Sequence, residues 1–218
     1  MAQVVKHAVT PPAAANKMLA ALAKVYPDAH CSLTFKTPFQ LLIATILSAQ
    51  CTDERVNKVT PTLFKKYPDA SSMSQAPLSD LEDLIRSTGF FKNKARSLQE
   101  TSRALVEKHG GKVPRTMEEL VLLRGIGRKT ANVVLGNAYG IAEGIAVDTH
   151  VGRLSRRMGI TKEHDPVKVE RTLMEIVPQK NWNLVTHWLI DHGRAVCDAR
   201  KPDCSHCPIR KSCPKILK

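Results

Sequence analysis

The order of apolar and polar positions predicts a chain built from helices. Apolar residues recur three and four positions apart in NKMLAALAKVY, which begins at residue 16. In TPFQLLIATILSAQ, Thr37 is placed as an N-cap and Pro38 at the first helical position. Because no alternating strand pattern occurs apart from the short GIAVDT segment, we predict an all-α fold.

Glycines and prolines divide the rest of this pattern. DERVNKVTPTLFKKY contains Pro61 and is predicted to form two helices, since proline disrupts a helix interior. Gly89 and the pair Gly110 and Gly111 are predicted to end the next two helices. Residues 1–16 show no period and are predicted to form a flexible arm. More helices are predicted in TMEELVLLRGIGRKTANVVLGNAYG, DTHVGRLSRRMG, DPVKVERTLMEIV and WNLVTHWLIDHGRAVC.

Composition and charge restrict the class of partner. The 218 residues are 43% hydrophobic but only 5% aromatic, which favours packed helices over a sandwich or barrel. A formal charge of +13 indicates a polyanionic partner, either nucleic acid or an anionic membrane. The longest apolar stretch, FQLLIATILSA, is about eleven residues and too short to span a bilayer. We therefore expect a bacterial cytoplasmic protein with no membrane partner and no secretory signal.

The segment LRGIGRKTAN predicts a tight hairpin between two helices. Gly125 and Gly127 bracket Ile126, whose side chain can return to the core. The helix that starts near Gly127 presents N–H groups and the positive end of its dipole, which suit a phosphate. Arg128 and Thr130 follow directly in the sequence. We predict that Gly125, Gly127, Arg128 and Thr130 contact DNA. The alternative is an ordinary turn between helices with solvated basic side chains.

Lys129 adds possible chemistry to this hairpin. A lysine has a pKa of roughly 10.4, so little of it is a neutral nucleophile at pH 7. The helix N-terminus, Arg128 and burial would each lower the pKa of Lys129, and a neutral amine can form a Schiff base with a sugar. Asp148 in AVDTH is the best carboxylate partner, for stabilising a sugar cation or moving protons. Its alternative role is the N-cap of the next helix, and the two roles are compatible.

Four of the six cysteines lie within the last 22 residues, which suggests a metal site in a reducing compartment. Their C-x6-C-x2-C-x5-C spacing suits either tetrahedral zinc or a [4Fe–4S] cluster. With only one C-x2-C pair, the cluster is favoured over zinc. His206 is interpreted as a solvated loop residue, and Cys31 and Cys51 as buried small hydrophobes. The predicted ligands are Cys197, Cys204, Cys207 and Cys213.

Taken together, LRGIGRKTANVVL, AVDTHVGRLSRR and the four-cysteine tail resemble the endonuclease III family. That family belongs to the helix-hairpin-helix superfamily of DNA glycosylases, and the similarity runs from about residue 17 to residue 214. The resemblance implies a bifunctional glycosylase and abasic-site lyase that removes oxidised pyrimidines and cleaves by β-elimination. A monofunctional glycosylase and a non-catalytic iron–sulfur DNA-binding protein are the alternatives. The adenine-removing branch lacks the hairpin lysine, so Lys129 argues against it.

The resemblance also assigns residue roles. It implies that Lys129 forms the Schiff base, that Asp148 is the catalytic aspartate and that the four cysteines hold a [4Fe–4S] cluster. Gln50 matches the glutamine that fills the gap left by an extruded base, and Phe90 matches the wedge beside the opposite strand. The wedge is commonly leucine, so Phe90 departs from the pattern. Arg124 is a second departure, since it replaces a proline and can add a phosphate contact.

Four further positions have a functional and a structural interpretation. Arg200 and Lys201 lie between the first two cysteines, where the family presents basic side chains to DNA, although a solvated loop would carry the same residues. Asp53 and His150 are predicted to line the pocket or, alternatively, to be satisfied structural residues.

The expected architecture has two helical lobes with DNA bound in the cleft between them. Residues 31–141 form a six-helix domain with the hairpin, and residues 17–30 with 142–218 form the cluster domain. Lys129 and Asp148 are expected to face each other at the mouth of the cleft. The expected partner is double-stranded DNA with oxidised pyrimidines or abasic sites, bound by a nucleoid-associated monomer.

Overall fold

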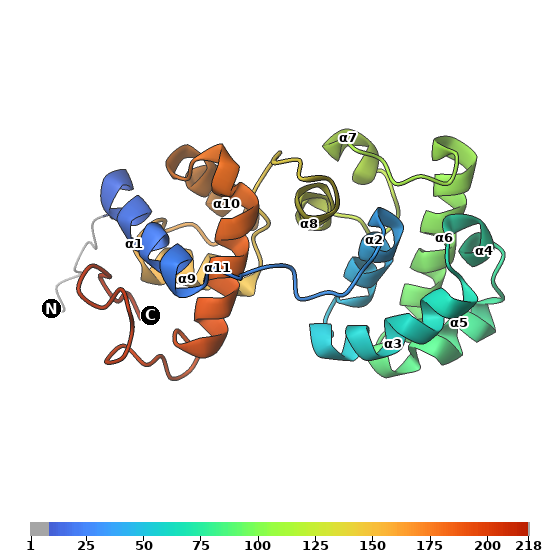
Figure 1. Ribbon diagram of the computed structural model, residues 1–218, viewed down its shortest axis with the longest axis horizontal. Coiled ribbons are helices and arrows are strands. Elements are labelled where there is room, and N and C mark those ends of the chain that lie inside the picture. Colours follow the sequence, from blue (N-terminus) through green and yellow to red (C-terminus); the bar gives the residue numbers. More distant parts are fainter. Residues whose placement is uncertain (1–8, 218) are drawn as a thin grey trace, which may run out of the picture. The chain divides into compact units, whose positions relative to one another are not determined.

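A computed structural model describes residues 9–217 as helices joined by loops (Figure 1). No strand occurs in this part of the chain, and the all-α prediction is confirmed. The chain divides into two compact units. We call Cys31–Glu143 the central unit, and Met1–His30 with Gly144–Lys218 the composite unit.

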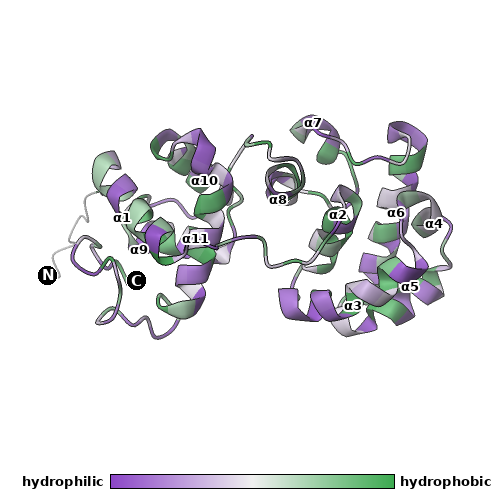
Figure 2. Cartoon of the chain, in the orientation of Figure 1, coloured by the Kyte–Doolittle hydropathy of each residue, from purple (hydrophilic) through white to green (hydrophobic). Residues whose placement is uncertain are grey.

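The central unit is built around α2 (Pro38–Leu47), a helix buried along almost its whole length. The Thr37 side chain accepts a hydrogen bond from the Gln40 N–H, so the predicted N-cap is confirmed. Helices α3, α6 and α8 pack around α2, and Figure 2 shows how hydrophobic and hydrophilic residues divide over them. The other elements are α3 (Asp53–Lys66), α4 (Ala70–Ser74), α5 (Leu78–Ile85), η1 (Arg86–Thr88), α6 (Phe91–His109), α7 (Met117–Leu120) and α8 (Arg128–Tyr139).

Helix α3 corrects one prediction, because Pro61 lies inside it and does not divide it. Val56 and Leu63 are fully buried on either side of the proline, whereas Pro61 itself is exposed. A helical proline costs about 3 kcal/mol, while burying each aliphatic side chain stabilises by about 1.5–3 kcal/mol. Packing of the two buried residues therefore keeps the helix continuous.

The composite unit packs α11 (Trp182–Ala195) against α1 (Pro12–Val25) and α9 (Thr149–Arg157), with α10 (Pro166–Ile176) beside α1 and α9. The 3-10 turn η2 (Gln179–Asn181) precedes α11. The core contains Leu22, Val151, Leu154, Leu173 and Leu189, all fully buried.

Helix α1 begins at Pro12, so residues 12–16 are helical and not part of a flexible arm, which corrects that prediction. Proline is favoured at a first helical position, the alanines that follow favour helix, and Ala15 is fully buried. Just before the helix, the Thr10 hydroxyl donates to the Met158 carbonyl at 2.8 Å. Residues 1–8 of the predicted arm lie outside the described residues.

Among residues 9–217, no helix has the length and apolar character needed to cross a membrane.

Candidate functional site

The predicted hairpin joins α7 and α8 in the central unit. Gly125 has a φ of +76°, in the left-handed region that glycine adopts without strain. Ile126 is only 4% exposed and belongs to the core of this unit, as its place between two glycines predicted. Gly127 is the N-cap of α8, and the Ala131 N–H donates to its carbonyl at 3.0 Å. The backbone N–H groups of the first turn of α8, which come before Ala131, are therefore the ones suited to bind an anionic oxygen.

Helix α6 supports the hairpin from one side. The Thr101 hydroxyl donates to the Arg124 carbonyl at 2.9 Å. The Arg124 guanidinium donates through Nη1 to Glu100 Oε2 at 2.5 Å. Sequence reasoning missed Glu100, because nothing in the local pattern links it to a position 24 residues away. The group predicted to contact phosphate thus has an intramolecular partner.

Lys129 occupies the first turn of α8 with Arg128, and both side chains are exposed. The prediction that burial acts on the Lys129 amine is therefore wrong for the unbound protein. Its exposure instead leaves the nitrogen accessible to an approaching nucleotide. Thr130 lies next along the helix and is half-buried.

Gln50 and Phe90 share an unusual backbone conformation in the central unit. Their φ values are +53° and +48°, in the left-handed region that side chains other than glycine rarely adopt. Gln50 is exposed in the loop after α2, and Phe90 is 64% exposed immediately before α6. A large aromatic ring held in solvent at a strained position is the kind of feature that functional sites retain.

Asp148 caps α9 in the composite unit. Its Oδ1 accepts a hydrogen bond from the Val151 N–H at 2.8 Å, so the N-cap role is confirmed. The residue is half-buried, and it directly follows the buried residues Ala146 and Val147. Its catalytic role stays a prediction.

His150 and Asp53 both lie at helix N-termini. Burial lowers the pKa of His150, and the charges of Arg153 and Arg194 lower it further, against the opposite effects of Asp148 and Asp198. The His150 Nδ1 lies 3.2 Å from Arg153 Nη2. Asp53 is the first residue of α3 and is half-buried. For both positions, the pocket role and the structural alternative stay predictions.

Four cysteines in the composite unit line one cavity that is partly open to solvent. Arg157, itself 9% exposed, orders the start of this segment by donating to the carbonyls of Asp198 and Ala199 at 2.6 and 2.7 Å. Its Nη1 also lies 3.5 Å from the Cys197 sulfur. Sequence reasoning missed this arginine, which reads as one more basic residue of α9. The cavity cysteines are Cys197, Cys204, Cys207 and Cys213.

The donor chemistry of this cavity fits an iron–sulfur cluster. Burial raises the pKa of Cys207 and Cys213, and the charges of the neighbouring cysteines raise it further. A cationic metal centre would offset both effects, because the thiolate is the ligating form. Within the described residues, no three His, Cys, Asp or Glu side chains are arranged to hold a single ion. Four cysteine thiolates are a donor set that a [4Fe–4S] cluster accepts.

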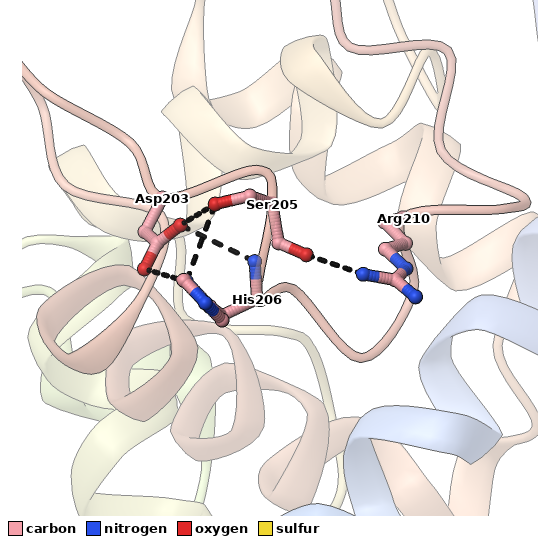
Figure 3. A network of polar contacts seen from close by, with 4 residues as sticks. All are labelled: Asp203, Ser205, His206 and Arg210. Atoms are coloured by element: carbon pink, nitrogen blue, oxygen red, sulfur yellow. Dashed lines mark hydrogen bonds and ion pairs between the residues drawn. The ribbon is translucent and has the colours of Figure 1, made fainter.

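A polar network shapes the turn between the second and third cysteines (Figure 3). Asp203 accepts from the Ser205 hydroxyl at 2.6 Å and lies 2.8 Å from His206 Nδ1. These hydrogen bonds lower the pKa of Asp203 to about 2, and the one from Ser205 has the largest effect. Arg210 closes the turn by donating to the Ser205 carbonyl at 2.6 Å. The His206 side chain is 83% exposed, which confirms it as a solvated loop residue.

Comparison with known proteins gives the family of this fold and its motifs. Residues 43–179 match the family described as HhH-GPD superfamily base excision DNA repair protein. Endonuclease III from Synechocystis sp. is 56% identical over 92% of this chain and 91% of its own length, and that from Bacillus subtilis 47% over 88% of each. A solved structure of a trapped endonuclease III–DNA covalent intermediate, an estranged-adenine complex, has a TM-score of 0.90 at 45% identity, covering 94% of this chain and 97% of the other.

The chain belongs to the HhH-GPD superfamily of base excision DNA repair proteins. Within it, the chain is a DNA glycosylase and abasic-site lyase of the endonuclease III type.

The predicted site residues of this endonuclease III-type chain divide between the two units. The central unit carries the hairpin, Lys129, Gln50, Phe90 and Asp53. The composite unit carries Asp148, His150 and the cysteines, with Arg200 and Lys201. The last two are exposed, and their backbone N–H groups donate to Asp198 Oδ1 at 2.8 and 3.0 Å.

Proposed function

We propose that this enzyme removes oxidised pyrimidines from double-stranded DNA through Lys129 and then cleaves the strand at the abasic site. The observation that carries the proposal is an exposed lysine in the first turn of α8, directly after a Gly-rich hairpin, in an endonuclease III-type chain. That lysine is accessible to a nucleotide extruded from the duplex, and extrusion is needed because the glycosidic bond is inaccessible inside it.

The chemistry requires an amine nucleophile, a group that removes protons and a carboxylate. The neutral Lys129 nitrogen attacks C1′ of the deoxyribose, the bond to the damaged base breaks, and the base leaves with the electron pair and takes up a proton. The C1′–O4′ bond then breaks, the ring oxygen takes up a proton to become the 4′ hydroxyl, and a protonated imine forms between Lys129 and C1′. Removal of a proton from C2′ then expels the 3′ phosphate, which is the β-elimination. We assign Asp148 to stabilising the sugar cation and to moving protons.

The remaining contacts position the DNA. We propose that Gly125, Gly127, Arg128 and Thr130 hold a phosphate at the start of α8, with Arg124 beside them. Gln50 enters the space that the extruded nucleotide leaves, and Phe90 inserts next to it. Arg200 and Lys201 contact the backbone from the composite unit. One chain supplies all of these residues, so we propose that a monomer acts on the nucleoid duplex.

We also propose that the four cavity cysteines hold a [4Fe–4S] cluster, supported by the single cavity that all four line. When bound, the cluster would cross-link the segment after α11 through Cys197, Cys204, Cys207 and Cys213. Base excision needs no redox step, so every reacting group is a side chain of the protein.

Borohydride trapping tests the lyase. With duplex DNA containing one abasic site, the wild-type protein is expected to form a covalent adduct, and Lys129→Ala is expected to form none. Lys108→Ala is the matched control, since it removes an exposed lysine near the end of α6. An adduct with Lys129→Ala at the wild-type level would assign the nucleophile to another amine. If the wild-type protein releases a damaged base from an intact lesion duplex but forms no adduct, it is a monofunctional glycosylase. If it shows neither activity, it is a DNA-binding protein.

The substrate class needs a separate measurement. The wild-type protein is incubated with duplexes that each carry one oxidised pyrimidine, oxidised purine, alkylated base or mismatched adenine. Base release is detected as strand scission after heating. We expect release from the oxidised pyrimidines. Exclusive release of another class would contradict the assigned substrate and leave the lyase assignment intact.

A further inference from the structure

Lys94 is a buried cation that neither the motifs nor the proposed chemistry uses. It lies in the first turn of α6 and is only 5% exposed. Its burial lowers its pKa, partly offset by Cys51. A lysine is rarely buried in this way unless its ammonium group is fully hydrogen-bonded, so its partners indicate its purpose.

The hydrogen-bond partners of the Lys94 side chain are two backbone carbonyls, each just before a loop. Its Nζ donates to the Leu47 carbonyl and to the Thr88 carbonyl, each at 2.8 Å. Leu47 is the last residue of α2, and Thr88 is the last residue of η1. The carbonyl ends of helices carry partial negative charge, which a cation complements. One side chain therefore connects the ends of two elements separated by about 40 residues of sequence.

These two loops carry Gln50 and Phe90. Gln50 follows Leu47 by three positions, and Phe90 follows Thr88 by two. The backbone N–H of Lys94 also donates to the Phe90 carbonyl at 3.1 Å. Both Gln50 and Phe90 have left-handed φ values, and such residues keep that conformation only where their surroundings fix it. Lys94 is hydrogen-bonded to the backbone next to both of these residues.

We propose that Lys94 is a positioning residue that holds the Gln50 and Phe90 loops in one fixed relation, so that both side chains enter the duplex together. The inference rests on the proposed function, because it takes these two side chains to act on DNA. It places the role of Lys94 at nucleotide extrusion and not at the covalent step. A substrate that needs no extrusion is therefore insensitive to Lys94.

The test compares β-elimination at an abasic site in duplex DNA with the same reaction in a single strand. Lys94→Met keeps an unbranched side chain but removes all donors. We expect its duplex rate to fall by about 10- to 100-fold, as for small misplacements of catalytic elements, and its single-strand rate to match the wild type. Lys94→Gln, a milder change, serves the same comparison if Lys94→Met does not fold.

Two controls separate positioning from charge and from stability. Lys108→Met removes the same charge from the exposed end of α6 and is expected to change neither rate. Leu98→Ala empties a fully buried core position of the same helix. It is expected to lower the melting temperature while keeping the wild-type ratio of duplex to single-strand rates. An equal change of this ratio in Leu98→Ala and Lys94→Met would reduce Lys94 to a stability role and overturn the inference.

Two further measurements test the coupling of the two loops, and the first of them does not depend on the proposed function. In hydrogen exchange without DNA, the amides of residues 48–51 and 89–91 are expected to exchange faster together in Lys94→Met. In a Gln50→Ala/Phe90→Ala background, Lys94→Met is expected to cause no additional loss of duplex activity. Unchanged exchange in both loops, or a full additional loss, would overturn the role of Lys94. If the wild-type protein cleaves neither substrate, the proposed function fails, while the exchange experiment still tests the coupling of the loops.

Discussion

At the residue scale, Arg124 shows how a neighbour modifies a predicted contact. The family pattern has proline at this position, and the arginine here is paired with Glu100 on α6. The two side chains are 54% and 41% exposed, and such a surface pair stabilises by only about 0.2–1 kcal/mol. A DNA phosphate can compete for the guanidinium at that energy, so Glu100 weakens the contact without preventing it.

The first prediction concerns this ion pair. Glu100→Gln releases Arg124, so duplex affinity is expected to rise and the dependence of log K on log salt to steepen by about 0.9 if one phosphate contact is gained. Binding titrations at several salt concentrations measure both quantities. In an Arg124→Ala background, Glu100→Gln is expected to change neither. A gain in affinity that persists there would come from the lost carboxylate charge and not from Arg124.

The second prediction concerns His187, which is 7% exposed in α11 of the composite unit. Burial lowers its pKa below the usual 6.5, and His30 lowers it further, while Asp191 and Asp148 act in the opposite direction. The unfolded chain therefore takes up the proton first as the pH falls below about 6.5. Stability should be highest above that pH and should decrease between it and the lower folded-state pKa. Melting temperatures from pH 7.5 to 5 are expected to fall less steeply in His187→Gln.

At the element scale, the helices whose ends carry local signals were predictable. Thr37 with Pro38 begins α2, and Gly110, with a φ of +58°, ends α6. Each of these signals acts through backbone hydrogen bonds or φ preference within a few residues. Pro61 was misread because the force that keeps α3 continuous comes from the core and not from its neighbours in sequence.

The third prediction concerns the contact of α9 with α11. A Cβ at Gly193 would lie 2.7 Å from His150 Nδ1 and 3.0 Å from Arg153 Nη2. Gly→Ala inside a helix usually stabilises by about 0.5–1 kcal/mol, but overpacking costs about 1–3 kcal/mol. We expect Gly193→Ala to destabilise the protein by about 1–2 kcal/mol, measured by denaturant unfolding. A stabilised variant would show that the side chains of His150 and Arg153 move aside at little cost.

At the scale of the whole molecule, each unit has its own hydrophobic core. The core of the central unit runs from Leu33 to Leu135, and that of the composite unit combines α1 with residues after Gly144. Cys197, Cys207 and Cys213 pack against the second core. Loss of the proposed cluster should therefore act on one unit first.

The fourth prediction follows from this division. Cys207→Ser is expected to lose the iron content and the visible absorption of the cluster, and amides of α9 and α11 should lose protection from hydrogen exchange. Amides of α2 and α6 should keep theirs, because they belong to the other core. Cys31→Ser, in the central unit and not among the residues that line the cavity, is the control and should retain iron. Equal loss of protection in both units would show that they unfold as one.

The sequence by itself determined the all-α class, the helix caps, the glycine hairpin and the grouping of four cysteines, because each depends on residues close together in the chain. The tertiary structure decided the exposure of Lys129, the continuity of α3 through Pro61, the pairing of Arg124 with Glu100 and the burial of Lys94. Glu100 lies 24 positions from Arg124, and Leu47 lies 47 positions from Lys94. Such contacts exist only after the helices pack, since a hydrogen bond or an ion pair between residues far apart in the sequence depends on their distance in space and carries no local signal.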